Sequence, residues 1–440
     1  MKAVISKYIF LLQRKGLYLI YSTRTNNFYE ISESLFRFIS DYDRNKELSE
    51  DEAEIVDMLL KKKILVAEGE DDMYYESLKF KHYFHSFSMG NLNVTIAPTV
   101  WCNLKCPYCY ESSKPKGVMS KEMCDKFIEF LQQAEYSKNL LLTWYGGEPL
   151  LGINEIEYLL GRIKKDVKNL RLTEHAIVTN GVLLKGKVID VFKKHPLTTL
   201  QITLDGNRDT HNRIRVKHNG EGTFDEILKN ISDFIKEFPS TGISVRVNID
   251  KNNASEFIQV KQMIINMFPE KKNLFVYAGI LRGDSSCHDN SFFKSKDTLQ
   301  FYKSTYDIFP EEEYPQQRGK GCTATCVAGY VIGPRGEIYN CWEDMGKKDK
   351  EIGNIADRKL NERELRKYVL HGHAFDDPKC RDCKLLPICD GGCPMKRVEN
   401  KYHGTDNELC SIYRDNDYAG LEDLLWAYYE TRYVKKAEVQ

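Results

Sequence analysis

Hydrophobic and polar positions follow a short-strand pattern over the first 80 residues of the chain. Its apolar runs lie at residues 8–12, 17–21 and 28–31. Polar segments between these runs predict strands joined by tight turns. Helical spacing follows at residues 35–39, and Ser49 with Glu52 has the spacing of a capping box before a second helix. Residues 1–80 therefore predict a winged-helix-like domain, and the acidic residues 68–76 predict a linker.

From residue 91 the pattern changes to strands that alternate with helices. The predicted strands are residues 92–97, 140–145, 175–179, 200–204, 243–249 and 274–278. The predicted helices are residues 121–133, 153–167, 187–193, 224–238 and 256–267. This alternation predicts an α/β fold with parallel strands, arranged over residues 91–308 as a partial six-stranded (β/α)6 barrel. In such barrels the loops after the strands hold the chemistry.

The last part of the chain differs in composition from the barrel region. Two prolines and three consecutive glutamates in residues 309–321 indicate a boundary. Residues 309–440 therefore predict a third, cysteine-rich domain, which an apolar helix around residues 421–433 closes.

Charge and hydropathy narrow the class of protein. The chain has 64 basic and 64 acidic side chains, and this balance argues against a nucleic-acid partner. Its apolar runs are shorter than the roughly 18 residues that a membrane helix needs, and the same observation argues against a signal peptide. A cytoplasmic location without a membrane partner is expected.

Thirteen cysteines are many for a protein of this kind, and they are clustered. In a reducing compartment such clusters bind metal or perform chemistry. Cys102, Cys106 and Cys109 follow the first barrel strand with the spacing C-x3-C-x2-C. Three thiolates can hold three irons of a cubane cluster and leave the fourth iron open, as a catalytic centre requires. A zinc site completed by a distant histidine, or three unrelated core cysteines, are the alternatives.

The segment CNLKCPYC after the first strand resembles the motif of radical S-adenosylmethionine enzymes. The resemblance implies a 4Fe–4S cluster that cleaves S-adenosylmethionine to methionine and a 5′-deoxyadenosyl radical. It places Tyr108 near the adenine of the cofactor. It also assigns the methionine ammonium to the GGEP motif, formed by Gly146, Gly147, Glu148 and Pro149. A carboxylate suits this task because it pairs with a cation. A plain turn before a helix is the alternative.

Later loops of the barrel extend this resemblance. Thr179 and Asn180 follow the third strand and Asp205 follows the fourth, where the family contacts the ribose. His211 and Arg215 match an H-x3-R stretch, in which the arginine meets the carboxylate of S-adenosylmethionine. Ordinary surface loops are the alternative for these residues.

Eight further cysteines lie after residue 320, and their chemistry permits two zinc ions or two iron–sulfur clusters. Their spacing resembles the SPASM extension of radical S-adenosylmethionine enzymes, which implies two auxiliary 4Fe–4S clusters and three clusters in all. The first auxiliary set would be Cys322, Cys326, Cys341 and Cys393. The second would be Cys380, Cys383, Cys389 and Cys410. Cys124 is expected in a helix core, and Cys287 is expected to be a plain loop cysteine.

SPASM-type enzymes mostly modify peptides, and the first 80 residues resemble a PqqD-like element that captures a leader peptide by adding a strand to a sheet. We therefore expect a maturase that cross-links a ribosomally made precursor peptide through a thioether or carbon–carbon bond. A flavodoxin or ferredoxin would supply the electron. The resemblance leaves the catalytic base unassigned.

Two alternatives stay open for the function. One is a sulfatase-maturase-like oxidase of a Cys or Ser side chain, although that type has an aspartate where Trp342 follows Cys341. Glu343 and Asp344 come only after Trp342. The other alternative is a non-catalytic peptide-binding or electron-transfer protein.

Overall fold

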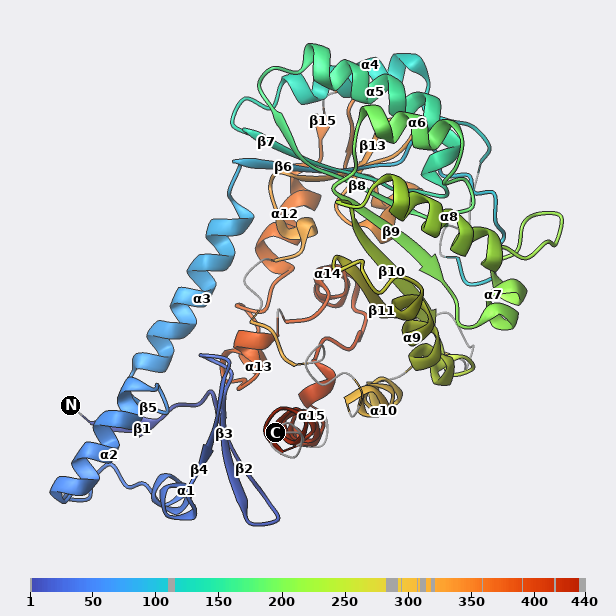
Figure 1. The fold of residues 1–440 in the computed structure, drawn as a ribbon. Coiled ribbons are helices and arrows are strands. Elements are labelled where there is room, and N and C mark those ends of the chain that lie inside the picture. The colour runs from blue at the N-terminus through green and yellow to red at the C-terminus, as the bar shows by residue number, and fades with distance from the viewer. Residues whose placement is uncertain are drawn as a thin grey trace. The chain divides into compact units, whose positions relative to one another are not determined.

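A computed structural model describes residues 2–109, 115–281, 292–293, 295–306, 308, 314–317, 321–357, 359–389, 391–414 and 417–434. The chain forms two compact units, which are described separately (Figure 1). The terminal unit comprises Met1–Phe87, Thr298–Thr325 and Lys367–Gln440. The sheet unit comprises Ser88–Asp297 and Cys326–Arg366.

A ten-stranded sheet forms the centre of the sheet unit, and its six predicted strands are confirmed. They are β6 (Asn91–Ile96), β7 (Asn139–Trp144), β8 (Arg171–Thr179), β9 (Thr199–Leu204), β10 (Gly242–Ile249) and β11 (Leu274–Ile280). All six run parallel in the spatial order β11-β10-β9-β8-β7-β6. Their carboxyl ends therefore meet at one edge of the sheet, where the loops that follow them come together.

The other four strands of the sheet come from the region after residue 320 and were not predicted. They are β12 (Gly329–Ile332), β13 (Glu337–Tyr339), β14 (Gly353–Asn354) and β15 (Lys359–Leu360). Strand β12 pairs parallel with β6, and β13 to β15 continue the sheet antiparallel. The fold class is thus α/β with a mostly parallel central sheet. The partial-barrel shape stays a prediction.

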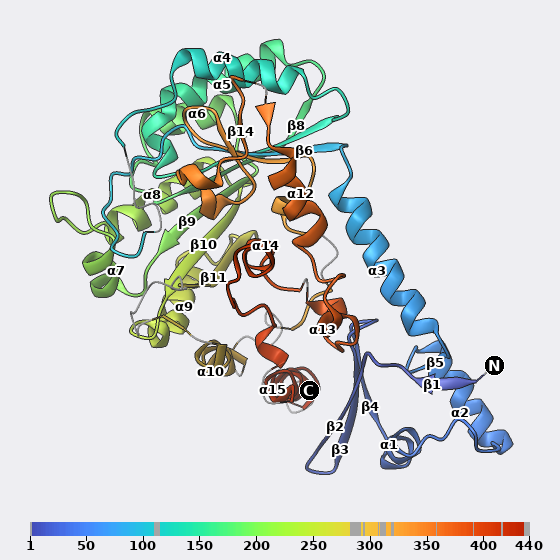
Figure 2. The same ribbon diagram turned by 180° about the vertical axis from the view of Figure 1, so that it is seen from behind.

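Helices connect the parallel strands as predicted and cover one side of the sheet (Figures 1 and 2). They are α4 (Lys121–Gln132), α5 (Ile153–Asp166), α6 (Lys187–Lys194), α8 (Phe224–Glu237) and α9 (Phe257–Met267). Helix α8 buries Phe224, Ile227, Ile231 and Phe234, a stripe with the helical period. A short helix, α7 (Arg208–Ile214), was not predicted and follows β9.

The amino-terminal part of the terminal unit has the predicted strands and helices. They are β1 (Ala3–Ile5), β2 (Ile9–Arg14), β3 (Leu17–Ser22), β4 (Asn27–Ile31), α1 (Glu33–Ser40), α2 (Glu50–Lys61) and β5 (Leu65–Ala67). Strands β2, β3 and β4 form an antiparallel meander, and β1 pairs with β5. The capping box of Ser49 and Glu52 is present at the start of α2. The likeness of this part to a winged helix stays a prediction.

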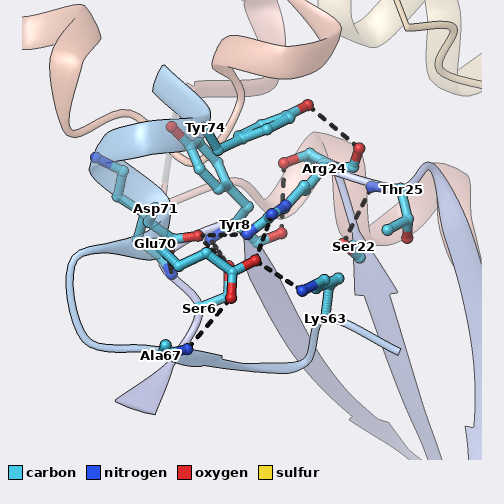
Figure 3. A network of polar contacts seen from close by, with 12 residues as sticks. Ser6, Tyr8, Ser22, Arg24, Thr25, Lys63, Ala67, Glu70, Asp71 and Tyr74 are labelled. Carbon is cyan, nitrogen blue, oxygen red and sulfur yellow. Dashed lines mark hydrogen bonds and ion pairs between the residues drawn. The ribbon is translucent and has the colours of Figure 1, made fainter. Parts of the chain in front are cut away.

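The prediction of an acidic linker at residues 68–76 is wrong, because this segment begins helix α3 (Glu70–Ser86). Acidic side chains in a first helical turn favour the helix through its dipole. Figure 3 shows that basic side chains from distant segments also pair with them. Arg24 lies 2.7 Å from Glu70 and 3.2 Å from Asp71, and Lys63 lies 2.8 Å from Glu70. The charge run is therefore an anchored helix start.

The terminal unit also contains short helices from the later part of the chain. They are α10 (Ser295–Tyr306), α12 (Glu362–His371), α13 (Pro378–Arg381), α14 (Pro394–His403) and α15 (Ala419–Tyr429). Helix α10 begins three residues before this unit does, and α12 begins in the sheet unit. Helix α15 confirms the predicted closing helix. In the part of the chain that the structure describes, every helix is too short or too polar to cross a bilayer.

One hydrophobic core joins the two ends of the chain within the terminal unit. Buried residues of β2 and β3 pack with buried residues that follow residue 380. They are Phe10, Leu12, Leu19, Tyr21, Leu385, Ile388, Leu421, Leu425, Trp426 and Tyr429. The amino-terminal strands therefore depend on the carboxyl-terminal helix for part of their core.

Candidate active site

The loop with the first three cysteines begins directly after β6. Cys102 is buried, and the Leu104 N–H lies 3.4 Å from its Sγ. The segment after α7 holds this loop in place, because the Lys105 N–H donates to the Val216 carbonyl at 3.0 Å. The ring of His218 also lies 3.0 Å from the Cys102 carbonyl oxygen. These supports come from positions that the sequence analysis did not single out.

The GGEP segment lies against the backbone of the cysteine loop. The Glu148 N–H donates to the Trp101 carbonyl at 2.9 Å, and the Gly147 N–H donates to the Thr99 carbonyl at 3.2 Å. A Cβ on Gly147 would lie 2.3 Å from the carbonyl oxygens of Val100 and Trp101. Glycine is therefore required here for close packing of two protein loops. This contact fixes Glu148 relative to the cysteines.

Glu148 is fully buried, with no exposed surface. Its Oε1 accepts hydrogen bonds from the Thr179 hydroxyl at 2.7 Å and from the Leu150 N–H at 3.0 Å. Its Oε2 accepts from the Asn180 N–H at 2.8 Å. Burial raises the pKa of Glu148, although these donors act in the opposite direction. A cation bound beside the carboxylate would favour its ionised form.

The side chains of Thr179 and Asn180 contact other protein groups of the site. The Thr179 hydroxyl is bonded to Glu148, so it orients the carboxylate. The Asn180 amide donates to Asn103 Oδ1 at 2.8 Å and lies 3.7 Å from Cys102 Sγ. Both residues thus link the third strand to the first two loops. Their predicted contacts with a ribose stay predictions.

Tyr108, Asp205 and Arg215 form one buried polar group at the next strands. The Tyr108 hydroxyl donates to Asp205 Oδ2 at 2.5 Å and accepts from Arg215 Nη1 at 2.9 Å. Asn248 at the end of β10 also donates to this hydroxyl, at 3.0 Å. Burial raises the pKa of Tyr108 well above its usual value and also raises the pKa of Asp205. The sequence analysis missed Asn248, since a single asparagine at a strand end has no distinguishing pattern.

His211 supports this group from below and takes no charge. It is fully buried, and its Nδ1 accepts from the Asp205 N–H at 3.3 Å while its Nε2 lies 3.0 Å from the Thr223 hydroxyl oxygen. That hydroxyl donates in turn to the Arg215 carbonyl at 2.8 Å. Burial, with the charge of Arg215, lowers the pKa of His211 to about 3. In the H-x3-R stretch the histidine is therefore a neutral positioning residue.

Two buried polar atoms of this group have no hydrogen-bond partner among the described residues. They are Asp205 Oδ1 and Arg215 Nε. Buried polar atoms are almost always bonded, so their environment fits a ligand that offers both a donor and an acceptor. A ribose hydroxyl and a carboxylate, which S-adenosylmethionine has, meet this requirement. The residues present therefore fit the cofactor that the resemblance implies.

The three cysteines of the loop do not form a single-ion site. Among the residues that the structure describes, no group of three or more Cys, His, Asp or Glu side chains is placed to hold one metal ion. In a cubane cluster each thiolate binds a different iron, so its ligands lie further apart. When bound, such a cluster supplies the electron that cleaves the sulfonium of S-adenosylmethionine. The assignment of Cys102, Cys106 and Cys109 to it stays a prediction.

The four cysteines of the second predicted auxiliary set all belong to the terminal unit. Arg397 Nη2 lies 3.2 Å from Cys380 Sγ, and Arg414 Nη1 lies 3.8 Å from Cys410 Sγ. Burial raises the pKa of Cys380 to about 11, and Arg397 opposes this effect. The nearby guanidinium groups suit thiolates, because they offset negative charge.

The remaining cysteines have different standings. In the first auxiliary set, Cys322 and Cys393 belong to the terminal unit and Cys326 and Cys341 to the sheet unit, so this set stays a prediction. Cys124 is buried on α4 as predicted, and burial raises its pKa to about 12. Cys287 lies outside the described residues.

Comparison with known proteins agrees with this geometry. Residues 96–264 match the sequence model of the radical SAM superfamily, where SAM is S-adenosylmethionine. This part of the chain is a radical SAM domain. It contains the cysteine loop, the GGEP segment and the group around Tyr108, and the protein is accordingly an enzyme of the oxidoreductase type.

Relatives of the whole chain modify proteins or peptides. The chain is 24% identical over 362 residues to the serine-type anaerobic sulfatase-maturating enzyme of Bacteroides thetaiotaomicron, which covers 71% of this chain and 85% of that protein. It is 25% identical over 399 residues to the antilisterial bacteriocin subtilosin biosynthesis protein AlbA of Bacillus subtilis, covering 81% and 82%.

A solved structure shows that the fold extends over most of the chain. The structure of native anSMEcpe with bound AdoMet and Kp18Cys peptide has a TM-score of 0.59 and 22% sequence identity. The superposition covers 80% of this chain and 100% of that one. At this identity the likeness concerns the fold alone.

Proposed function

We propose that this protein is a radical SAM peptide maturase that cross-links a ribosomally made precursor peptide. One observation supports the cofactor part most directly. A fully buried carboxylate, Glu148, is held by three hydrogen bonds beside the cysteine loop, next to the unpaired polar atoms of Asp205 and Arg215. An ammonium, a carboxylate and a ribose would satisfy these three groups.

The peptide class of the substrate rests on the relatives. Sulfatase-maturating enzymes and the subtilosin protein AlbA have sequences that span most of this chain. The amino-terminal sheet β2-β3-β4 has two edge strands, and an edge strand can accept an incoming peptide by strand addition. We assign the leader peptide to this sheet, and the auxiliary clusters to the two cysteine sets after residue 320.

A tryptophan favours cross-linking over sulfatase maturation. Sulfatase maturases, as the resemblance has it, place an aspartate directly after the cysteine that Cys341 matches. Here Trp342 holds that position, and its ring packs on Tyr145 with 4.6 Å between centroids. Because Tyr145 precedes the GGEP segment, an aromatic pair stands where the maturase has its base. Sulfatase maturation remains the second candidate, since the first relative reported above has that activity.

Mass spectrometry of the peptide product separates the two candidates. The protein is reconstituted anaerobically with iron and sulfide and is given S-adenosylmethionine and a reductant. One substrate is a short cysteine-containing peptide encoded beside the gene, and the other is a sulfatase-type peptide with a target cysteine. Cross-linking removes two hydrogens and keeps the sulfur, whereas sulfatase maturation expels the sulfur. Sulfur loss from the sulfatase-type peptide, with the first peptide unchanged, would overturn the proposal.

A further inference from the structure

Helix α3 of the terminal unit has one exposed apolar face along its outer side (Figure 1). Met73, Phe80, Phe84 and Phe87 are 67%, 69%, 72% and 49% exposed. With Ser77 they are spaced four, three, four and three residues apart, which is the spacing of a coiled-coil seam. The rings of Phe80 and Phe84 stack with 6.2 Å between centroids.

The opposite side of α3 is occupied within its own unit. Tyr74 packs edge-on against Tyr8 at 5.3 Å, and the Tyr75 hydroxyl donates to the Phe375 carbonyl at 2.6 Å. The Tyr83 hydroxyl oxygen lies 3.0 Å from the ring of His373. The seam is therefore not needed to attach the helix to its unit.

The size of the seam fits a small protein interface. A phenylalanine has roughly 150–250 Å² of surface, so the four exposed fractions amount to about 500 Å² of apolar area. Contiguous apolar patches of several hundred Å² mark interaction sites. A standard interface buries about 800 Å² on each partner. The seam accordingly predicts a weak association that depends on concentration.

The charges beside the seam identify a partner with the same helix. Asp72 and Glu76 are exposed in the first half of α3, while Lys79 and Lys81 lie in the second half. Lys79 is only loosely paired, at 3.8 Å from Asp376. Two copies of α3 in antiparallel orientation would place the acidic half of each beside the basic half of the other. A two-fold axis produces this contact twice.

The same orientation fits the side chains of the seam by size. If the two-fold axis passes between residues 78 and 79, Phe80 of one copy faces the small Ser77 of the other. Phe84 then faces Met73, and Glu76 lies near Lys79. We propose that two copies of this protein associate through an antiparallel pair of α3 helices.

Sedimentation velocity and light scattering on the full chain test this proposal at several micromolar concentrations. The wild type is expected to shift from one chain of 51.2 kDa towards twice that mass as concentration rises. Phe80→Glu is expected to stay at one chain. The control is Tyr136→Glu, which changes a 71% exposed aromatic residue of the sheet unit and should leave the shift unchanged. Equal behaviour of the two variants, or a monomeric wild type, would overturn the proposal.

Charge reversal tests the orientation and does not depend on the aromatic substitution. Glu76→Lys alone is expected to weaken the association at least tenfold. The double variant Glu76→Lys with Lys79→Glu should restore it, since the pair is re-formed with opposite sign. Restoration by Lys81→Glu instead of Lys79→Glu would contradict the antiparallel register. The unfolding temperatures of all variants should equal that of the wild type, because these side chains contribute little to the fold.

Discussion

Replacing Glu148 by Gln removes the negative charge of the candidate cofactor site with almost no change in shape. Each carboxylate oxygen of Glu148 accepts at least one short hydrogen bond, from Thr179 and Leu150 on one side and from Asn180 on the other. A glutamine has one oxygen and one NH₂ group. Whichever way the amide is oriented, at least one buried donor then faces another donor.

The expected effect on cofactor affinity follows from this geometry. A hydrogen bond to a charged group contributes about 1.5–3 kcal/mol. Loss of the bond to the ammonium of S-adenosylmethionine should therefore raise Kd about ten- to a hundred-fold. The donor left without an acceptor should also lower the free energy of unfolding by about 1–3 kcal/mol. Iron content should not change, because no cysteine is touched.

Anaerobic equilibrium dialysis with S-adenosylmethionine measures Kd, and an iron assay accompanies it. Glu337→Gln is the matched control. Glu337 is also buried, and it accepts from Arg335 N–H at 2.8 Å and from Arg335 Nε at 2.7 Å. Its replacement should reduce stability but leave Kd unchanged. An unaltered Kd in Glu148→Gln, or an equal loss of affinity in the control, would refute the role of Glu148.

Three further predictions concern neighbouring residues. Thr179→Val should raise Kd for S-adenosylmethionine about tenfold, because the hydroxyl that orients Glu148 is lost, whereas Thr179→Ser should bind normally. Equal affinities of the two variants would contradict this. Gly147→Ala should lower the iron bound per chain after reconstitution, since its methyl group would lie 2.3 Å from carbonyl oxygens of the cysteine loop; normal iron content would disprove the packing argument. His175→Gln should flatten the pH dependence of unfolding. Burial lowers the pKa of His175 to about 4, and the Trp144 indole N–H donates to its Nε2 at 2.8 Å. Below pH about 6.5 the unfolded state therefore binds a proton that the folded state excludes, and the wild type should lose about 1.4 kcal/mol per pH unit down to pH about 4. A variant with the wild-type slope would rule this out.

Local patterns were sufficient to predict most of the regular structure. The strands and crossover helices of the sheet unit follow from their periodicity, because each buries a continuous apolar face. The capping box at Ser49 and Glu52 depends only on residues three positions apart. Such features are visible in a single sequence because their partners are close in the chain.

Features that depend on distant partners could not be predicted. The acidic start of α3 resembles a solvated linker until Arg24 and Lys63 are seen to pair with Glu70 and Asp71. Strand β12 is a short apolar segment whose partner, β6, lies more than 200 residues earlier. The core shared by β2, β3 and α15 is likewise invisible, because its two halves lie at opposite ends of the chain.

The candidate site shows the same division between local and distant information. Motif spacing predicted which loops would meet, and the structure brings Glu148, Thr179 and Asn180 into one hydrogen-bonded group with the cysteine loop. It did not predict that Gly147 packs on backbone, or that His211 is neutral and supports Asp205. These functions depend on which atoms face each other across strands.

Release of 5′-deoxyadenosine after anaerobic reconstitution tests the central claim most directly, since it requires neither the precursor peptide nor the auxiliary clusters. The wild type, given S-adenosylmethionine and dithionite, should release 5′-deoxyadenosine and methionine in equal amounts. The variant with Cys102, Cys106 and Cys109 all changed to Ala should release neither, while Cys124→Ala, in the core of α4, should behave as the wild type. Equal release by the wild type and the triple variant, or no release by a wild type that binds iron, would contradict a radical SAM active site at this loop.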